Sequence, residues 1–285
     1  YETNCSRFKR FKQRSSILSG FIPLKLYSLI LKVLYLPFVV RLRVRKAWHC
    51  ENLNHPESIE LLCLNRFNDS KEFYEEHKLE LKEGITVPMR QIVLDLSGLM
   101  YDIDDKMLTD PVRSVSRIYR DTRGNRSKIK YRENMWLMLR RYKKEYPSAP
   151  FFYFEFYPNS FGYGLAFWTW KQSAFKEVHN LIMEHPGRWL DAVDACKQAG
   201  LTYNARDNYK KDMYPDAPKE IKPYLSAKNM EFSYSSFDMN RINSPSLIDE
   251  LKLAFDLARP MYSFWANAYD NMLDKGIIKP EDAIR

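Results

Sequence analysis

The residues best suited to chemistry lie at positions 117–131, which read Arg-Ile-Tyr-Arg-Asp-Thr-Arg-Gly-Asn-Arg-Ser-Lys-Ile-Lys-Tyr. Arginine is planar and permanently charged, and its fork of N–H groups matches the oxygens of a carboxylate or a phosphate. So many cations side by side are costly unless an anion or an internal acid neutralises them. The segment therefore predicts either a site that binds an anion or an internal network of ion pairs.

The spacing of this segment suggests how its side chains are arranged. If residues 117–123 are extended, alternate side chains share a face, which places Arg117, Asp121 and Arg123 together. Asp121 would then bridge the two guanidinium groups and hold them rigid for a ligand. Arg120 would face the opposite side unless a turn begins at Asp121.

Three further polar residues are candidates for the same site. Lys128 and Tyr131 follow in a loop within reach of a bound anion, and Tyr131 is a candidate proton donor. Glu155 lies among aromatic residues, so it is either paired with an arginine or has a pKa raised by burial. Pairing with the arginines of residues 117–123 would satisfy both groups. The alternative is an exposed sheet face that leaves Glu155 in water.

The basic segment also resembles the motif of a known family. The family pattern is close to RxxRDxRFxx[DN]KxxY, and the matching residues are Arg117, Arg120, Asp121, Arg123, Lys128 and Tyr131. Gly124 stands where the family has Phe, and Ser127 stands where the family has Asp or Asn.

Three other segments extend this resemblance. Residues 70–74 are similar to an NREWF-like helix start, residues 161–168 to an FxGGGxW segment, and residues 244–251 to the start of the closing helices. Over residues 60–275 the chain thus resembles an uncharacterised family of bacterial proteins, which also occurs within some larger fungal proteins. The resemblance implies a shared fold but no activity, because the family has no settled one.

The net charge of +9 is unevenly distributed along the 285 residues. Residues 1–58 carry eleven Lys or Arg against three acids, which leaves residues 59–285 with 34 basic and 33 acidic side chains. The high pI therefore gives no support for a nucleic-acid-binding domain. Within this nearly neutral part, residues 113–144 hold twelve Lys or Arg against two acids. That local excess is the better functional signal.

Metal and cofactor sites find no support in the residue pattern. Cys5, Cys50, Cys63 and Cys196 are scattered, without the spacing of a metal site, and are typical of reduced thiols in a cytoplasmic protein. The acids of residues 102–105 lack the spacing of a calcium loop. The sequence therefore predicts neither a metal nor a cofactor.

Aromatic residues are dense at positions 151–170. Beside a basic groove, such side chains stack on the bases of single-stranded nucleic acid. Strands bury aromatic residues in cores more often than they expose them, so we do not favour this function. Gly162 and Gly164 form a lone GxG pair, which predicts a bulge or the close approach of another segment.

Residues 1–58 form a basic and apolar leader before the predicted domain. Residues 17–40 are mostly apolar, but Lys25, Ser28 and Lys32 make one narrow polar stripe if the segment is helical. Three interpretations stay open: a disordered or spuriously translated leader, a helix lying in the membrane interface, and a spanning helix. Contact with a membrane is expected only through residues 17–40, and the protein is otherwise expected in the cytoplasm.

Residues 59–285 are predicted to form one domain. The predicted helices cover residues 70–81, 87–100, 171–184, 186–198, 245–257 and 260–273, with a break at Gly84. The predicted strands cover residues 112–120, 135–139, 151–157, 163–170 and 230–237, with a hairpin across residues 158–160 and a long loop at residues 201–226. Strands in mid-chain with helices at both ends indicate an α+β fold, an antiparallel sheet covered on one face.

The sequence thus predicts that a single α+β domain binds a small ligand with phosphate or carboxylate groups. The expected anion contacts come from four basic residues, Arg117, Arg120, Arg123 and Lys128. Asp121 is expected to orient the arginines, and Tyr131 and Glu155 to supply hydrogen bonds or protons. The residues do not specify a reaction. The alternatives are an ion-pair network in an interaction protein and the binding of single-stranded nucleic acid.

Overall fold

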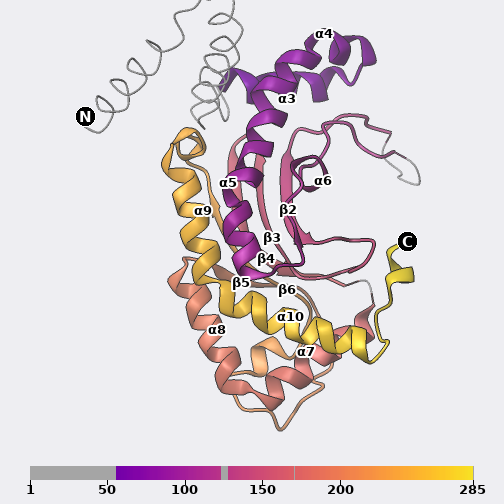
Figure 1. Ribbon diagram of the computed structural model, residues 1–285, viewed down its shortest axis with the longest axis vertical. Coiled ribbons are helices and arrows are strands. Elements are labelled where there is room, and N and C mark those ends of the chain that lie inside the picture. The colour runs from indigo at the N-terminus through magenta and orange to yellow at the C-terminus, as the bar shows by residue number, and fades with distance from the viewer. Residues whose placement is uncertain (1–55, 123–127, 170, 285) are drawn as a thin grey trace, which may run out of the picture. The chain divides into compact units, whose positions relative to one another are not determined.

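The computed structural model describes residues 56–122, 128–169 and 171–284 (Figure 1). Two sequence predictions therefore lie wholly or mostly outside the described residues: the contact of Arg123 with an anion, and the leader at residues 1–58, of which residues 1–55 with the apolar stretch are not described. Residues 56–58 are helical. Within the described ranges, no helix has both the length and the apolar character needed to cross a membrane.

The described residues form an α+β domain, as predicted. Its helices are α3 (Pro56–Asn68), α4 (Lys71–Leu81), α5 (Val87–Ile103), α6 (Pro111–Ser114), α7 (Gln172–Glu184), α8 (Pro186–Gln198), α9 (Ser246–Leu257) and α10 (Arg259–Asp274). Its strands are β1 (Met107–Leu108), β2 (Met135–Arg141), β3 (Phe151–Tyr157), β4 (Ser160–Phe167), β5 (Thr202–Asn208) and β6 (Ala227–Ser236).

The strands form one antiparallel sheet in the order β1-β2-β3-β4-β6-β5. Helices α5 and α9 lie against one face of this sheet, and α10 packs on α7 and α8 beside them (Figure 1). The core lies between these helices and the sheet, with Phe152, Phe154 and Phe232 fully buried there. Helices from both ends of the chain thus cover a sheet made in its middle, as the sequence predicts.

Alternation along β2 shows how the two faces differ. Met135, Leu137 and Leu139 are fully buried toward the helices, whereas Trp136 and Met138 between them are partly exposed. Because successive strand residues point to opposite faces, the second set marks an open face. We use this term for the face that carries Trp136, Met138 and Arg140 of β2, together with the side chains in register with them on the neighbouring strands.

Most predicted elements are confirmed, including the helix at residues 70–81 and the hairpin of β3 and β4. The strand predicted at residues 112–120 is wrong: its first part belongs to helix α6, and the rest makes isolated bridges at Val115 and Tyr119 without forming a strand. The Asp110 carboxylate accepts hydrogen bonds from the Val112 and Arg113 amides, and Pro111 takes the first helical position. These are strong helix-start signals, and they outweigh the β propensity of the residues that follow.

The loop predicted at residues 201–226 is wrong for residues 202–208, which form β5 at the edge of the sheet. Its polar composition suits an edge strand, where charged side chains discourage pairing with another chain. The break predicted at Gly84 is also wrong, because a π-helical turn, Lys82–Thr86, joins α4 to α5. A Cβ at Gly84 would lie 2.3 Å from the Ser58 Oγ, so glycine is needed there for α3 to approach.

The two glycines of β4 serve close approach, as predicted. A Cβ on Gly164 would lie 2.1 Å from the Phe232 carbonyl oxygen, and one on Gly162 would lie 2.8 Å from the Tyr234 carbonyl oxygen. Both oxygens belong to β6, the neighbouring strand. The glycines therefore let β6 pack closely against β4 in the centre of the sheet.

Candidate functional site

The basic segment forms an irregular hairpin, residues 115–137, that leads into β2. Isolated antiparallel bridges pair Val115 with Leu137 and Tyr119 with Tyr131. The Arg120 amide donates to the Lys130 carbonyl at 2.7 Å. The hairpin thus brings the two ends of the predicted motif together, although residues 123–127 at its tip lie outside the described ranges.

Asp69 fixes this hairpin to the junction of α3 and α4. Its Oδ1 accepts hydrogen bonds from the backbone amides of Lys130 at 2.8 Å and Tyr131 at 3.1 Å. Asp69 has a φ of 47°, in the left-handed region, which non-glycine residues adopt only occasionally and which Asp tolerates better than most. Ser70 then caps α4 by accepting from the Phe73 amide at 3.0 Å. The segment at residues 69–74 therefore begins a helix and also holds the hairpin.

Tyr131 is the apolar anchor of the same junction. Its ring stacks on Tyr74 at 5.0 Å between centroids and meets the edge of Tyr119 at 5.2 Å. The side chain is fully buried, and its hydroxyl has no hydrogen-bond partner within the described residues. Burial, followed by the charges of nearby groups, raises the pKa of Tyr131, so the phenol stays protonated. In this position Tyr131 packs the hairpin against α4.

Three arginines gather on the hairpin: Arg117, Arg120 and Arg132. Burial lowers the pKa of Arg132, and repulsion from Arg120 and Arg117 lowers it further. The Arg132 guanidinium lies over the Trp136 ring, 4.3 Å from its centroid, and its Nε donates to the Arg117 carbonyl at 3.2 Å. Among the described residues, no carboxylate pairs with any of these three guanidinium groups. The described part of the hairpin therefore concentrates three guanidinium charges with no carboxylate paired to them.

The other predicted members are distributed as follows. Lys128 is exposed on the hairpin, and Asp121 is exposed and engaged in an interaction. Arg117 is exposed and Arg120 is half-buried. The hairpin thus brings together the described residues of the motif, with Tyr131 beneath them.

Glu155 lies apart from this cluster, in the middle of β3 on the open face. Burial raises the pKa of its carboxyl, Arg206 opposes that shift, and Glu231 adds to it. The predicted pairing with the arginines of residues 117–123 is therefore not the observed arrangement within the described residues. The arginine near Glu155 belongs to β5, which the sequence suggested was a loop.

Arg206 is itself part of a hydrogen-bonded network on the open face. Its Nε donates to the Glu231 Oε2 at 2.6 Å, and Tyr153 donates its hydroxyl to the other oxygen of Glu231. Glu231 is 2% exposed, so this buried carboxylate is satisfied by a cation and a phenol. The hydrogen bond to Glu231 is the main reason that the pKa of Arg206 is raised.

Comparison with known families decides where the chain belongs. A family model described as "Conserved hypothetical protein (DUF2461)" matches residues 57–264. The chain belongs to this family. The predicted resemblance is thereby confirmed: the match covers residues 57–264, where the sequence suggested residues 60–275. No curated protein and no solved structure matches the chain.

Within this DUF2461 domain, sequence reasoning did not single out two arginines that the structure places beside candidate residues, Arg132 beside Arg117 and Arg206 near Glu155. Arg132 lies in the stretch of residues 113–144, where basic residues are in excess, so its charge was visible but its place beside Arg117 was not. Arg206 gave no signal, because its role depends on pairing between β5 and β6. In the described part of the chain, no group of three or more His, Cys, Asp or Glu is placed to hold a metal ion.

Proposed function

We propose that the protein binds a small anionic ligand, through phosphate or carboxylate groups, at the arginines of the hairpin. The observation that carries the proposal is the absence of a carboxylate partner for Arg117, Arg120 and Arg132 within the described residues. Guanidinium groups that repel one another and stack on an aromatic ring favour an oxyanion that neutralises them.

The hairpin is suited to this role because it is fixed before a ligand arrives. The carboxylate of Asp69 holds two of its amides, and Tyr131 packs it on Tyr74. Preorganisation of this kind lowers the entropy lost on binding. In the proposal, Arg117, Arg120 and Arg132 contact the anion, and Lys128 on the same hairpin adds to the positive charge. Tyr131 positions the hairpin.

The main alternative is a purely structural ion-pair network. The same domain shows what such a network looks like in Arg141, which is 5% exposed and pairs with Asp104 and Asp270. The hairpin arginines differ from Arg141 in both respects, since they are more exposed and have no described acid partner. This contrast favours binding over a structural role.

Binding of single-stranded nucleic acid has less support. It would need exposed aromatic rings beside the basic hairpin. In the segment dense in aromatics, Phe152, Phe154, Phe156, Phe161 and Phe167 are instead buried under the helices. Trp136 is a partly exposed ring at the hairpin, and Arg132 already covers it.

Calorimetric titration with pyrophosphate and with citrate tests the proposal. We expect binding to the wild type and a loss of at least about tenfold in affinity in Arg120→Ala, because a charge-assisted hydrogen bond contributes about 1.5–3 kcal/mol. Arg188→Ala on α8 removes the same charge from an exposed site elsewhere and should bind like the wild type. Equal affinity in the two variants, or no binding of either anion to the wild type, would contradict the proposal.

A further inference from the structure

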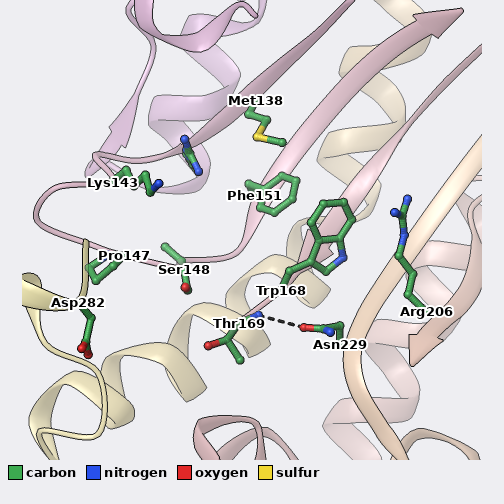
Figure 2. A pocket seen from close by; sticks show the side chains of 12 residues that line it. Met138, Lys143, Pro147, Ser148, Phe151, Trp168, Thr169, Arg206, Asn229 and Asp282 are labelled. Atoms are coloured by element: carbon green, nitrogen blue, oxygen red, sulfur yellow. Dashed lines mark hydrogen bonds between the residues drawn. The ribbon is translucent and has the colours of Figure 1, made fainter. Parts of the chain in front are cut away.

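A cavity of about 440 Å³ lies on the open face, at the end of β2 that is farther from the hairpin. It is bordered by the loop at residues 143–149, the start of β3 and the end of β4, and β5 and β6 close its other side (Figure 2). Its size falls in the range of small-molecule sites. No described residue that lines the cavity belongs to the hairpin at residues 115–137. The cavity is therefore distinct from the hairpin site.

Arg140, at this end of β2, is the cation that distinguishes the cavity. It is half-buried, and within the described residues no carboxylate pairs with its guanidinium and no hydrogen bond engages it. Burial, with no acid to offset it, lowers the pKa of Arg140. Its neighbour Arg141 points to the helix-covered face and binds two aspartates, whose hydrogen bonds outweigh the effect of burial and raise its pKa. The fold thus pairs Arg141 with two acids and leaves the adjacent Arg140 without one among the described residues.

The other charges around the cavity leave it positive. Arg206 is neutralised by Glu231, and Asp282 accepts from the Lys279 amide at 3.0 Å and lies 4.0 Å from the Lys171 Nζ. Lys143 borders the cavity and has no acid partner among the described residues. Arg140 and Lys143 therefore remain as two cations that a bound anion would neutralise.

The wall beside Arg140 is aromatic, because Phe151 is its register partner on β3. Phe151 meets the Trp168 ring edge-on, 5.1 Å between centroids, and the Arg206 guanidinium lies 4.5 Å from the same indole. Figure 2 shows Trp168 standing between these two residues, with Met138 beside Phe151. Because Glu231 holds Arg206, the indole is fixed in place. Such a wall favours a flat apolar ring.

Polar groups at the rim complete the lining. The Thr169 amide donates to the Asn229 Oδ1 at 3.0 Å (Figure 2). This bond orients the Asn229 side-chain amide, and Ser148 also borders the cavity. These groups are placed to hydrogen-bond a substituent of a ligand, in the pattern of a mostly apolar site with a few fixed polar contacts.

We propose that this cavity binds an aromatic oxyanion, a flat ring that carries a phosphate or a carboxylate. The oxyanion lies against Arg140 and Lys143, and the ring lies against Phe151, Trp168 and Met138. The site and its ligand class are independent of the hairpin. Phosphate and carboxylate share the chemistry that Arg140 recognises, and the two cations favour the more highly charged phosphate.

Calorimetric titration with four probes tests the proposal: phenyl phosphate, benzoate, inorganic phosphate and benzyl alcohol. We expect phenyl phosphate to bind most tightly, benzoate more weakly, and the two single-feature probes at least about tenfold more weakly than phenyl phosphate. Inorganic phosphate binding as tightly as phenyl phosphate would overturn the role of the ring. Failure of both aromatic anions to bind would overturn the site.

Variants locate the binding. Arg140→Met should weaken phenyl phosphate by at least about tenfold, and Arg188→Met, which changes the net charge equally, should not. Lys143→Ala alters an exposed side chain, so it tests the same anion contact with no demand on folding. It should weaken phenyl phosphate more than benzoate. Wild-type affinity in both Arg140→Met and Lys143→Ala, or a loss produced instead by Arg120→Ala, would overturn the assignment.

Discussion

Arg141→Met and Arg140→Met should affect the stability of the domain in opposite ways, because Arg141 is paired with acids and Arg140 is not. Arg141→Met removes a side chain that is 6% exposed and leaves Asp104, also 6% exposed, with a buried charge. Breaking a buried pair from one side costs about 3–5 kcal/mol. Asp104 keeps hydrogen bonds from the Tyr262 hydroxyl at 2.7 Å and the Lys106 amide at 3.0 Å, and Asp270 is 40% exposed. The lower end, about 3 kcal/mol, is therefore expected.

Arg140→Met should behave oppositely. It removes a half-buried charge that no described acid offsets and leaves no carboxylate unpaired, so the free energy of unfolding should stay the same or rise. Urea unfolding at pH 7 measures both variants, provided that the slope with denaturant is unchanged. For a domain of this size, 3 kcal/mol corresponds to a decrease in Tm of about 6–12 °C.

The pH dependence of this pair gives a second readout. The pKa of Asp104 is lowered: burial opposes its ionisation, but hydrogen bonds from Tyr262 and Arg141 outweigh that effect. A lowered carboxyl pKa stabilises the fold above the unfolded value and loses that contribution as pH falls. The gap between wild type and Arg141→Met should therefore narrow below about pH 4. A loss in Arg140→Met as large as in Arg141→Met would refute the distinction.

Three further predictions concern strand packing, a buried histidine and the anchor of the hairpin. In urea unfolding, Gly164→Ala should destabilise the domain by more than about 2 kcal/mol, because the new Cβ would lie 2.1 Å from the Phe232 carbonyl oxygen. Gly98→Ala in α5 is the control: its Cβ would have nothing within 4 Å, so it should stabilise the domain by about 0.5–1 kcal/mol. Burial lowers the pKa of His179 to about 4. The free energy of unfolding of the wild type should therefore fall by about 3 kcal/mol more than that of His179→Gln between pH 7.5 and pH 4. Parallel plots of unfolding free energy against pH for the two proteins would contradict this. Asp69→Gly keeps the left-handed turn but removes the carboxylate, so hydrogen exchange of the Tyr131 amide should become faster. In Asp69→Asn, which keeps a side-chain oxygen, the exchange rate should stay close to that of the wild type. An unchanged exchange rate in Asp69→Gly would contradict the role of Asp69 as an anchor.

Local patterns predicted the layers of the fold but not the pairing of its charges. The alternation in residues 135–141 and the aromatic run of β3 identify strands, because burial repeats every second residue. The partners of Arg141 lie 37 and 129 residues away in sequence, so no local pattern connects them. The strand β5 was missed for the same reason: its exposed polar residues show no strand pattern, and they form a strand because they pair with β6.

For the candidate site, too, the local arrangement was predictable from the sequence and the contacts between distant segments were not. The described motif residues, 117–122 and 128–131, do gather on one hairpin, because two segments close in sequence pair locally. Burial of the Tyr131 ring could not be predicted, since it depends on Tyr74, which is 57 residues earlier in the chain. Burial raises the pKa of Glu155, which is one of the alternatives that the sequence left open, but its neighbour Arg206 comes from the strand that was missed.

The division between the two sheet faces explains why the unpaired cations point to binding. On the helix-covered face the described buried charge is paired, as for Arg141, because a lone ion there would destabilise the fold. On the open face, Glu231 is also paired, while Arg140 and Arg132 keep unneutralised charge at opposite ends of β2. The fold supplies acids to its most buried charges but leaves half-buried guanidinium groups such as Arg140 and Arg132 without one, and in the two proposals an external anion neutralises these groups. Stability should therefore depend on Arg141, and ligand affinity on Arg140 and Arg120.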